Sequence, residues 1–215
     1  MKKLEISALA FSKDFNQFKN DVDTMLKNGI IDLHYDVMDN IFVPNSSFQN
    51  LEHLDYLIEK NFSISVHLMV QDVESYLKKI VYKNVRYITF HCESQDVEKS
   101  IELIRFIRSK NIKAGIAIKP KTNIAEYEKL IKIADIITIM SVEPGFGGQK
   151  YIAGSDKRVM EIKKIAKQDA IFQIDGGIND ETLPIVKNCC DMFVSGSFLY
   201  KNASKYKELL KIINL

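Results

Sequence analysis

Two side chains that can share a metal ion or a proton lie two residues apart, at His34 and Asp36. They fall within residues 32–39, whose surroundings are rich in β-branched and aromatic residues and therefore predict a strand. Because side chains alternate between the two faces of a strand, this imidazole and this carboxylate point to the same side and can reach a common point. A metal site or a proton-transfer site would need further partners from other parts of the chain.

The elements that position this pair follow a regular alternation along the chain. Apolar, β-branched runs alternate with amphipathic segments rich in Lys and Glu, which predicts repeated strand–helix units around a parallel sheet. The expected strands are residues 4–10, 31–38, 63–70, 85–93, 113–119, 136–142, 170–175 and 192–197. The expected helices are residues 14–27, 51–60, 72–81, 97–109, 124–133, 155–167, 180–187 and 204–213. This alternation favours one α/β domain over residues 1–215, a single (β/α)8 TIM barrel, over an open doubly wound sheet.

The composition is that of an ordinary globular protein, with 46% hydrophobic and 27% charged residues in a chain of 215. The net charge of +2 and the scattered basic residues argue against nucleic acid as a partner. Neither a signal peptide nor a membrane span of about 18 apolar residues is expected. Three cysteines without metal-ligand spacing, Cys92, Cys189 and Cys190, fit a reducing cytoplasm.

The barrel prediction places the chemistry at the carboxyl ends of the strands. Polar residues stand at these ends: Ser7, His34, Asp36, His67, His91, Lys119, Asp175 and Ser197. Two imidazoles and two carboxylates belong to this set: His34, His67, Asp36 and Asp175. Each of the four can be an independently hydrogen-bonded buried group. Their common placement favours the alternative, a site for a divalent metal such as zinc, iron or manganese with room for substrate oxygens.

Several other side chains near these ends have a structural and a functional interpretation. His91 is expected to have a structural role or to support a metal ligand, rather than to bind the metal itself. His53, in a helical segment with Glu52 and Asp55, is expected at the surface. Three methionines at strand ends either fill the core or form an apolar wall over a substrate; they are Met38, Met69 and Met140.

Glycine-rich loops follow the last three predicted strands. In residues 142–151, Gly145, Gly147 and Gly148 allow close approach of the backbone to a ligand, and Phe146 can close over it as part of a mobile lid. The next two loops contain Gly176, Gly177, Gly196 and Ser197. Loops at these positions of a barrel commonly bind phosphate through backbone N–H groups and a short helix, although ordinary turns would also use glycine.

The motifs together resemble the ribulose-phosphate 3-epimerase family. The resemblance runs from the first strand to the last, through the following segments: His34-Tyr35-Asp36-Val37-Met38-Asp39, Phe42-Val43-Pro44-Asn45, His67-Leu68-Met69-Val70, the loop from Val142 to Gln149, Asp175-Gly176-Gly177 and Ser195-Gly196-Ser197. The first segment and the ten-residue loop are highly specific. Asn40 and Gln49 depart from the family pattern, since glycine is common at both positions, and the segment from Ser7 to Asp14 is slightly longer.

The resemblance implies a metal-dependent interconversion of D-ribulose 5-phosphate and D-xylulose 5-phosphate in the pentose phosphate pathway. It implies one divalent metal ion, Zn²⁺ in the first place with Fe²⁺, Mn²⁺ or Co²⁺ as alternatives, held by His34, Asp36, His67 and Asp175. Asp36 and Asp175 match the acid/base residues that exchange the C3 proton through an enediolate. The implied substrate contacts are Ser7, His67, Met38, Met69, Met140, Gly145, Phe146, Gly147, Gly148, Gly176, Gly177, Gly196 and Ser197. A phosphorylated ketopentose substrate, no membrane partner and a homo-oligomer are expected.

Three other functions fit parts of this pattern. A 3-epimerase of a hexulose phosphate such as allulose 6-phosphate would use the same mechanism, although this chain keeps the pentose-type glycine motifs. A phosphosugar decarboxylase would not account for a set of two His and two Asp. A non-catalytic barrel that binds a phosphosugar would not need Asp36 and Asp175 on opposite faces of the ligand.

Overall fold

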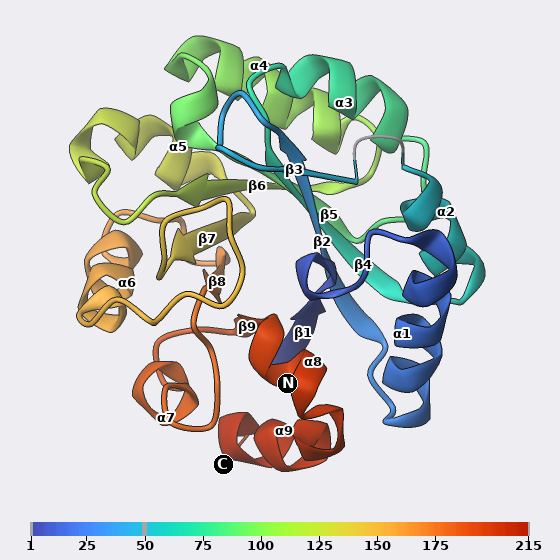
Figure 1. Ribbon diagram of the computed structural model, residues 1–215. Coiled ribbons are helices and arrows are strands. Elements are labelled where there is room, and N and C mark those ends of the chain that lie inside the picture. Colours follow the sequence, from blue (N-terminus) through green and yellow to red (C-terminus); the bar gives the residue numbers. More distant parts are fainter. Residues whose placement is uncertain (1, 49–50, 215) are drawn as a thin grey trace.

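The structure is a computed structural model that describes residues 2–48 and 51–214. Eight parallel strands form a closed sheet with helices around it (Figure 1). The sheet runs in the order β1, β2, β4, β5, β6, β7, β8, β9, and β9 pairs with β1 to close the barrel. The predicted (β/α)8 TIM barrel is therefore confirmed. Gln49, one of the departures from the family pattern, lies outside the described residues.

The barrel strands are short and buried, as expected for strands covered on both faces. They are β1 (Lys3–Ser7), β2 (Asp32–Asp39), β4 (Ser63–Met69), β5 (Tyr87–His91), β6 (Lys113–Ile118), β7 (Ile136–Met140), β8 (Ile171–Asp175) and β9 (Met192–Ser195). A further two-residue strand, β3 (Ser46–Ser47), pairs antiparallel with the end of β2 and was not predicted. It extends the sheet beside the mouth of the barrel.

Helices and 3-10 turns connect the strands and cover the outside of the barrel. The helices are α1 (Phe15–Lys27), α2 (Glu52–Glu59), α3 (Val73–Ile80), α4 (Val97–Arg108), α5 (Glu128–Ile133), α6 (Ser155–Lys163), α7 (Leu183–Val186), α8 (Ser197–Lys201) and α9 (Tyr206–Asn214). The 3-10 turns are η1 (Ala8–Ala10), η2 (Cys92–Ser94), η3 (Ile124–Tyr127) and η4 (Ala203–Lys205). Aspartates cap three of the helices, because Asp14, Asp72 and Asp96 each accept a backbone N–H of the first turn. None of the described helices is long and apolar enough to cross a membrane.

Two predicted boundaries differ from the structure at positions that matter for the site. The first strand ends at Ser7 instead of residue 10, because the Ser7 hydroxyl accepts the N–H of Leu9 and starts the turn η1. The eighth strand ends at Ser195, and the residues after Gly196 form the short helix α8. The turn after β2 keeps its shape without glycine, since Asn40 adopts a φ of 61°.

The barrel interior contains two stacked layers of polar side chains. Glu5, Ser65 and Gln173 each lie two residues before a residue of the mouth on the same strand, so they point inward one step closer to the amino ends. Tyr87 joins them because it is paired with Ser65 in the β4–β5 register. We call these four residues the lower polar layer. Below them, an apolar cluster that includes Ile136 and Met192 closes the amino end of the barrel.

Candidate active site and metal centre

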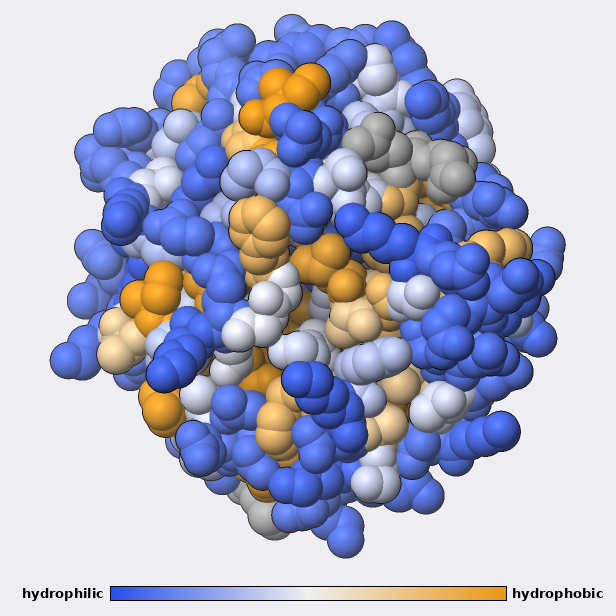
Figure 2. All heavy atoms as spheres, viewed as in Figure 1, coloured by the Kyte–Doolittle hydropathy of each residue, from blue (hydrophilic) through white to orange (hydrophobic). Residues whose placement is uncertain are grey.

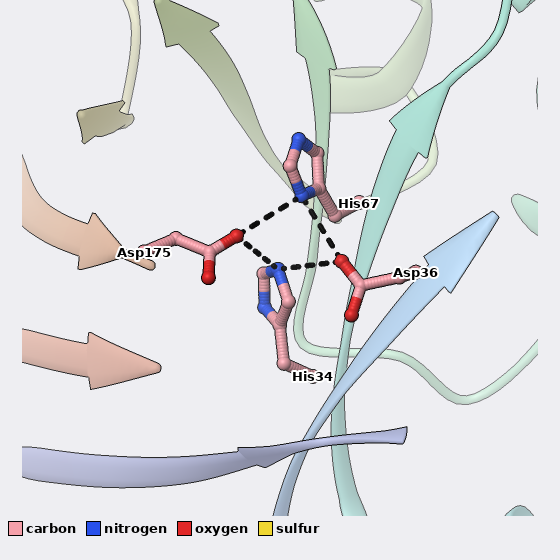
Figure 3. Close-up of side chains that lie close together, drawn as sticks. All are labelled: His34, Asp36, His67 and Asp175. Atoms are coloured by element: carbon pink, nitrogen blue, oxygen red, sulfur yellow. Dashed lines mark hydrogen bonds and ion pairs between the residues drawn. The ribbon is translucent and has the colours of Figure 1, made fainter. Parts of the chain in front are cut away.

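Four side chains at the carboxyl ends of β2, β4 and β8 point toward one centre (Figure 3). We call His34, Asp36, His67 and Asp175 the ligand cluster. One ligand atom from each residue lies within 4.8 Å of all the others. Nδ1 of His67 is 3.2 Å from Oδ1 of Asp36 and 3.5 Å from Oδ2 of Asp175, and Nε2 of His34 is 3.5 Å and 3.8 Å from the same two oxygens. The structure thus brings together the four residues that the strand-end pattern had grouped.

The charges of the ligand cluster attract a cation. Burial alone would lower the pKa of His34, but the charge of Asp36, the hydrogen bond with Glu5 and the charge of Asp175 outweigh it and raise that pKa to about 9. Burial likewise opposes a charge on His67, yet hydrogen bonds to Asp175 and Asp36 raise its pKa. The imidazoles in turn hold the pKa of Asp36 below its usual value, against the effect of burial. The centre therefore favours a positive charge, whether a proton or a metal ion supplies it.

The donor set fits a divalent metal ion. Nε2 of His34 is buried and has no hydrogen-bond partner among the described residues, although it faces the two carboxylates. Two imidazole nitrogens and two carboxylate oxygens are suitable ligands for zinc, iron, manganese or cobalt. For three of the four ligands, the atom that points away from the centre is hydrogen-bonded to another side chain, which is the usual way in which proteins orient metal ligands.

Ser7 orients one of the two carboxylates. Its hydroxyl donates a hydrogen bond of 2.5 Å to Oδ2 of Asp36, the oxygen that does not face the other ligands. Ser7 also lines the cavity described below, because η1 turns the chain away directly after it. Its predicted contact with substrate is compatible with this position and stays a prediction.

His91 supports His67 from the side of the barrel. Burial lowers the pKa of His91 to about 4, so its ring is neutral, and its Nδ1 donates to Glu93 over 3.2 Å. Nε2 of His91 is then free to accept the Nε2–H of His67, 3.0 Å away. A neutral His67 consequently presents the lone pair of Nδ1 to the centre. His91 itself lies outside the ligand cluster, as expected.

A cavity of about 680 Å³ opens above the ligand cluster. This volume suits a small phosphorylated sugar, since ligand pockets commonly measure about 300–1,000 Å³. Figure 2 shows apolar and weakly polar residues around a hollow at the centre of this face, with hydrophilic residues around them. The predicted site residues that line the cavity are Ser7, Asp36, Met38, Met69, Met140, Gly145, Phe146, Gly147, Gly148, Asp175, Gly176, Gly177, Gly196 and Ser197. His34 and His67 are fully buried and lie outside this lining.

The long glycine loop is tied to the opposite side of the mouth. The amide of Asn45, in the loop after β2, donates to the carbonyl of Gly145 over 2.7 Å. The next residue, Phe146, is 53% exposed and lines the cavity. Its closing over a ligand stays a prediction. Behind the loop, a Cβ atom on Gly177 would lie 2.4 Å from the backbone nitrogen of Tyr151, and φ at Gly177 is +65°. Glycine is required there because two backbone segments approach each other closely.

The methionines form part of an apolar wall on one side of the cavity. Met38 and Met69 pack with Val43 in one buried cluster, and Leu9 and Phe42 pack against it. Met140 lies at the end of β7, is 3% exposed and also lines the cavity. These side chains make their part of the cavity apolar.

Two features of the site region could not be seen in the sequence pattern. His53, expected at the surface, is buried between the rings of Phe15, Phe18 and Phe48, and that expectation is wrong. The cavity also has lining residues that were not predicted, among them Leu9, Lys150, Tyr151, Asn179, Thr182, Lys201 and Asn202. Lys201 and Asn202 reach the cavity because α8 turns the chain back over the mouth.

Comparisons with known proteins agree with this geometry. The fold and the ligand cluster define a TIM-barrel protein with a site suited to a metal ion and a small ligand. The model of the ribulose-phosphate 3 epimerase family matches residues 5–200. Ribulose-phosphate 3-epimerase of Buchnera aphidicola subsp. Baizongia pistaciae is 33% identical over 100% of this chain and 99% of its own length. The enzyme of the same name from Bacillus subtilis is 29% identical, over 97% and 98%. The chain belongs to the ribulose-phosphate 3-epimerase family and is an enzyme of that type.

Solved structures with low sequence identity share the fold alone. 3-Hexulose-6-phosphate synthase from Salmonella typhimurium is 14% identical with a TM-score of 0.70, over 100% of this chain and 97% of the other. Tryptophan synthase from Mycobacterium tuberculosis is 10% identical with a TM-score of 0.69, over 100% and 89%. These likenesses support the barrel and carry no argument about the reaction.

Proposed function

We propose that this protein interconverts D-ribulose 5-phosphate and D-xylulose 5-phosphate by moving the proton on C3. The observation that carries the proposal is the placement of two carboxylates at the base of the cavity. Asp36 comes from β2 and Asp175 from β8, and they approach the centre from opposite sides of the two imidazoles (Figure 3). Both also line the cavity, so each can reach a bound sugar.

Inversion at C3 needs a base on one face of the carbon and an acid on the other. One carboxylate removes the proton, which leaves an enediolate, and the other returns a proton to the opposite face. The two residues exchange roles when the other epimer is bound. Ser7 holds Oδ2 of Asp36 so that this carboxylate keeps its orientation during the transfer.

The ligand cluster would hold one divalent metal ion, with Zn²⁺ as the first expectation. When bound there, the ion supplies positive charge that stabilises the oxygens of the enediolate. The apolar wall of Met38 and Met69 limits water near the reacting carbon, which protects the intermediate from protonation by solvent.

The glycine loops beside β8 and β9 supply the proposed phosphate contacts. Gly177 and Gly196 expose backbone at one side of the cavity, and Ser197 begins α8 there. Backbone N–H groups at such positions bind phosphate in many barrels. Phe146 would cover the sugar from above. A cytoplasmic location, a homo-oligomer and the absence of nucleic acid or membrane partners stay predictions.

The proposal is tested by turnover of D-ribulose 5-phosphate in deuterated water with metal-depleted and Zn²⁺-restored protein. We expect D-xylulose 5-phosphate with deuterium at C3, activity lost after chelation and activity regained with metal. Undiminished turnover in metal-free protein would contradict the metal site. A parallel assay with allulose 6-phosphate tests the hexulose alternative, and faster turnover of that substrate would replace the pentose assignment.

A further inference from the structure

We propose that Glu5 and Ser65, in the lower polar layer, position His34 for metal binding. The inference rests on the proposed metal centre and extends it to residues that touch neither metal nor substrate. Glu5 is fully buried on β1, and its carboxylate lies directly behind the His34 ring. Nδ1 of His34 is 2.9 Å from the Ser65 hydroxyl and 3.3 Å from Oε2 of Glu5.

The neighbours of Glu5 show that its side chain is an ionised acceptor. Tyr87 donates to both oxygens, at 2.9 and 3.0 Å, and the Gln173 amide donates over 2.9 Å. The orientation of that amide is fixed because its oxygen accepts the hydroxyl of Thr138 over 2.7 Å. Arg86 also donates to Glu5 and provides the balancing positive charge. These donors and the positive charge of Arg86 stabilise the ionised form of Glu5.

The ionised carboxylate determines where the remaining hydrogens point. The Ser65 hydroxyl has one hydrogen, which it donates to Oε2 of Glu5 over 2.8 Å. The Ser65 oxygen can then only accept from Nδ1 of His34, so that nitrogen carries a hydrogen. When the ring is neutral, as metal binding requires, its lone pair is thereby placed on Nε2, the buried atom without a hydrogen-bond partner among the described residues that faces Asp36 and Asp175. Glu5 thus selects the ring form that binds a metal.

This role differs from that of an ordinary buried ion pair. A carboxylate behind a ligand imidazole fixes the ring orientation and makes the imidazole a stronger donor to the metal. In the variant Glu5→Gln, an NH2 group replaces one of the two acceptor oxygens. Because Arg86 donates to the Oε1 side, the amide oxygen would stay there and the NH2 group would face Ser65. The Ser65 hydrogen would turn toward Nδ1 of His34, and the hydrogen of the ring would move to Nε2, where it blocks the metal.

The test measures the Zn²⁺ dissociation constant by competition with a chromophoric chelator, together with kcat at saturating Zn²⁺ and thermal stability. We expect Glu5→Gln and Ser65→Ala to weaken Zn²⁺ binding by about 10- to 100-fold. At saturating Zn²⁺ we expect kcat to stay within about tenfold of the wild-type value, since neither residue reaches the cavity. Weak metal binding with nearly normal kcat is a combination that general destabilisation would not produce.

Tyr87→Phe is the matched control. It removes one donor to Glu5 from the same layer and leaves the connection from Glu5 through Ser65 to His34 in place. Stability should fall in this variant while Zn²⁺ affinity stays within about twofold of wild type. If Glu5→Gln does not fold, the Zn²⁺ dissociation constant of Ser65→Ala tests the same proposal. If both Glu5→Gln and Ser65→Ala bind Zn²⁺ with wild-type affinity, the proposed positioning role of Glu5 and Ser65 is wrong, while the metal centre itself still stands. Failure of the wild-type protein to bind Zn²⁺ would overturn the metal centre as well.

Discussion

The two polar layers inside the barrel differ in their residues and in how their charges are balanced. In the lower polar layer the carboxylate of Glu5 is surrounded by hydrogen-bond donors, and Arg86 neutralises it. The ligand cluster lies next to this layer, closer to the carboxyl ends of the strands. There two carboxylates and two imidazoles face one another, and one ring nitrogen has no hydrogen-bond partner among the described residues. The four residues of the lower polar layer all form hydrogen bonds with protein groups, whereas the ligand cluster is suited to bind a cation.

This difference separates residues that stabilise the barrel from residues for which we propose a chemical role. Buried polar groups stabilise a fold when every donor and acceptor is paired, and they are costly when one is not. Within the described residues, the ligand cluster has such an unpaired atom, Nε2 of His34, near the mouth of the barrel, where a metal ion and substrate can enter. Substitutions in the two layers should therefore have different effects, and three predictions test this.

The largest expected effect is on catalysis, for Asp175→Asn in the ligand cluster. The amide can still offer an oxygen to the metal but cannot accept the C3 proton, so kcat should fall by about 10³-fold or more while bound metal is retained. Steady-state kinetics and metal analysis of the purified variant provide the measurement. Asp169→Asn, which alters a carboxylate that is 81% exposed, serves as a control and should leave kcat unchanged. Near-normal activity of Asp175→Asn would exclude this residue from acid/base chemistry.

The second prediction concerns stability, for Arg86→Met beside the lower polar layer. The variant leaves the fully buried Glu5 without its positive partner, and the free energy of unfolding should fall by about 2 kcal/mol, reduced from the range for a buried pair because Arg86 is 25% exposed. Urea denaturation measures the change. The comparison variant is Arg108→Met, whose partner Asp135 is also bound by Lys167, and it should lose less than about 1 kcal/mol. Equal losses would show that the lower layer has no special structural role.

The smallest effect is expected at Glu93, beside the ligand cluster. Burial alone would raise the pKa of Glu93, but hydrogen bonds from His91, Thr122 and the Lys119 N–H outweigh it and lower the pKa to about 2. A lowered pKa contributes stability that is present above the usual value of 4.5 and is lost as the pH falls toward 2. We expect Glu93→Gln to cost about 1 kcal/mol at pH 6, since the amide oxygen keeps some of these bonds.

The measurement for Glu93 is the difference in unfolding free energy between wild type and Glu93→Gln at several pH values. That difference should shrink as the pH falls below 4.5, because protonation removes the charge that the variant already lacks. A difference that stays constant down to pH 3 would mean that the charge of Glu93 contributes nothing.

The sequence by itself determined the barrel and the members of the ligand cluster. Strand alternation is local, so the shared face of His34 and Asp36 follows from their spacing, and the carboxyl ends of parallel strands must lie at one face of the barrel. His67 and Asp175 could be added for the same reason. The turn at Asn40 was also predictable, because asparagine tolerates positive φ.

Only the tertiary structure decided the features that depend on contacts across the barrel. Glu5 lies in a short apolar run near the start of the chain, and nothing in its neighbours indicates that it meets residues from β4, β5 and β8. His53 has charged neighbours in sequence but packs among phenylalanines from other segments. The positions of the hydrogens on His34 and His67 depend on similar long-range contacts, because they are set by Ser65 and His91, 31 and 24 residues away in the sequence. Spacing within a strand determines the face to which a side chain points, and packing across the closed sheet determines which residues it contacts.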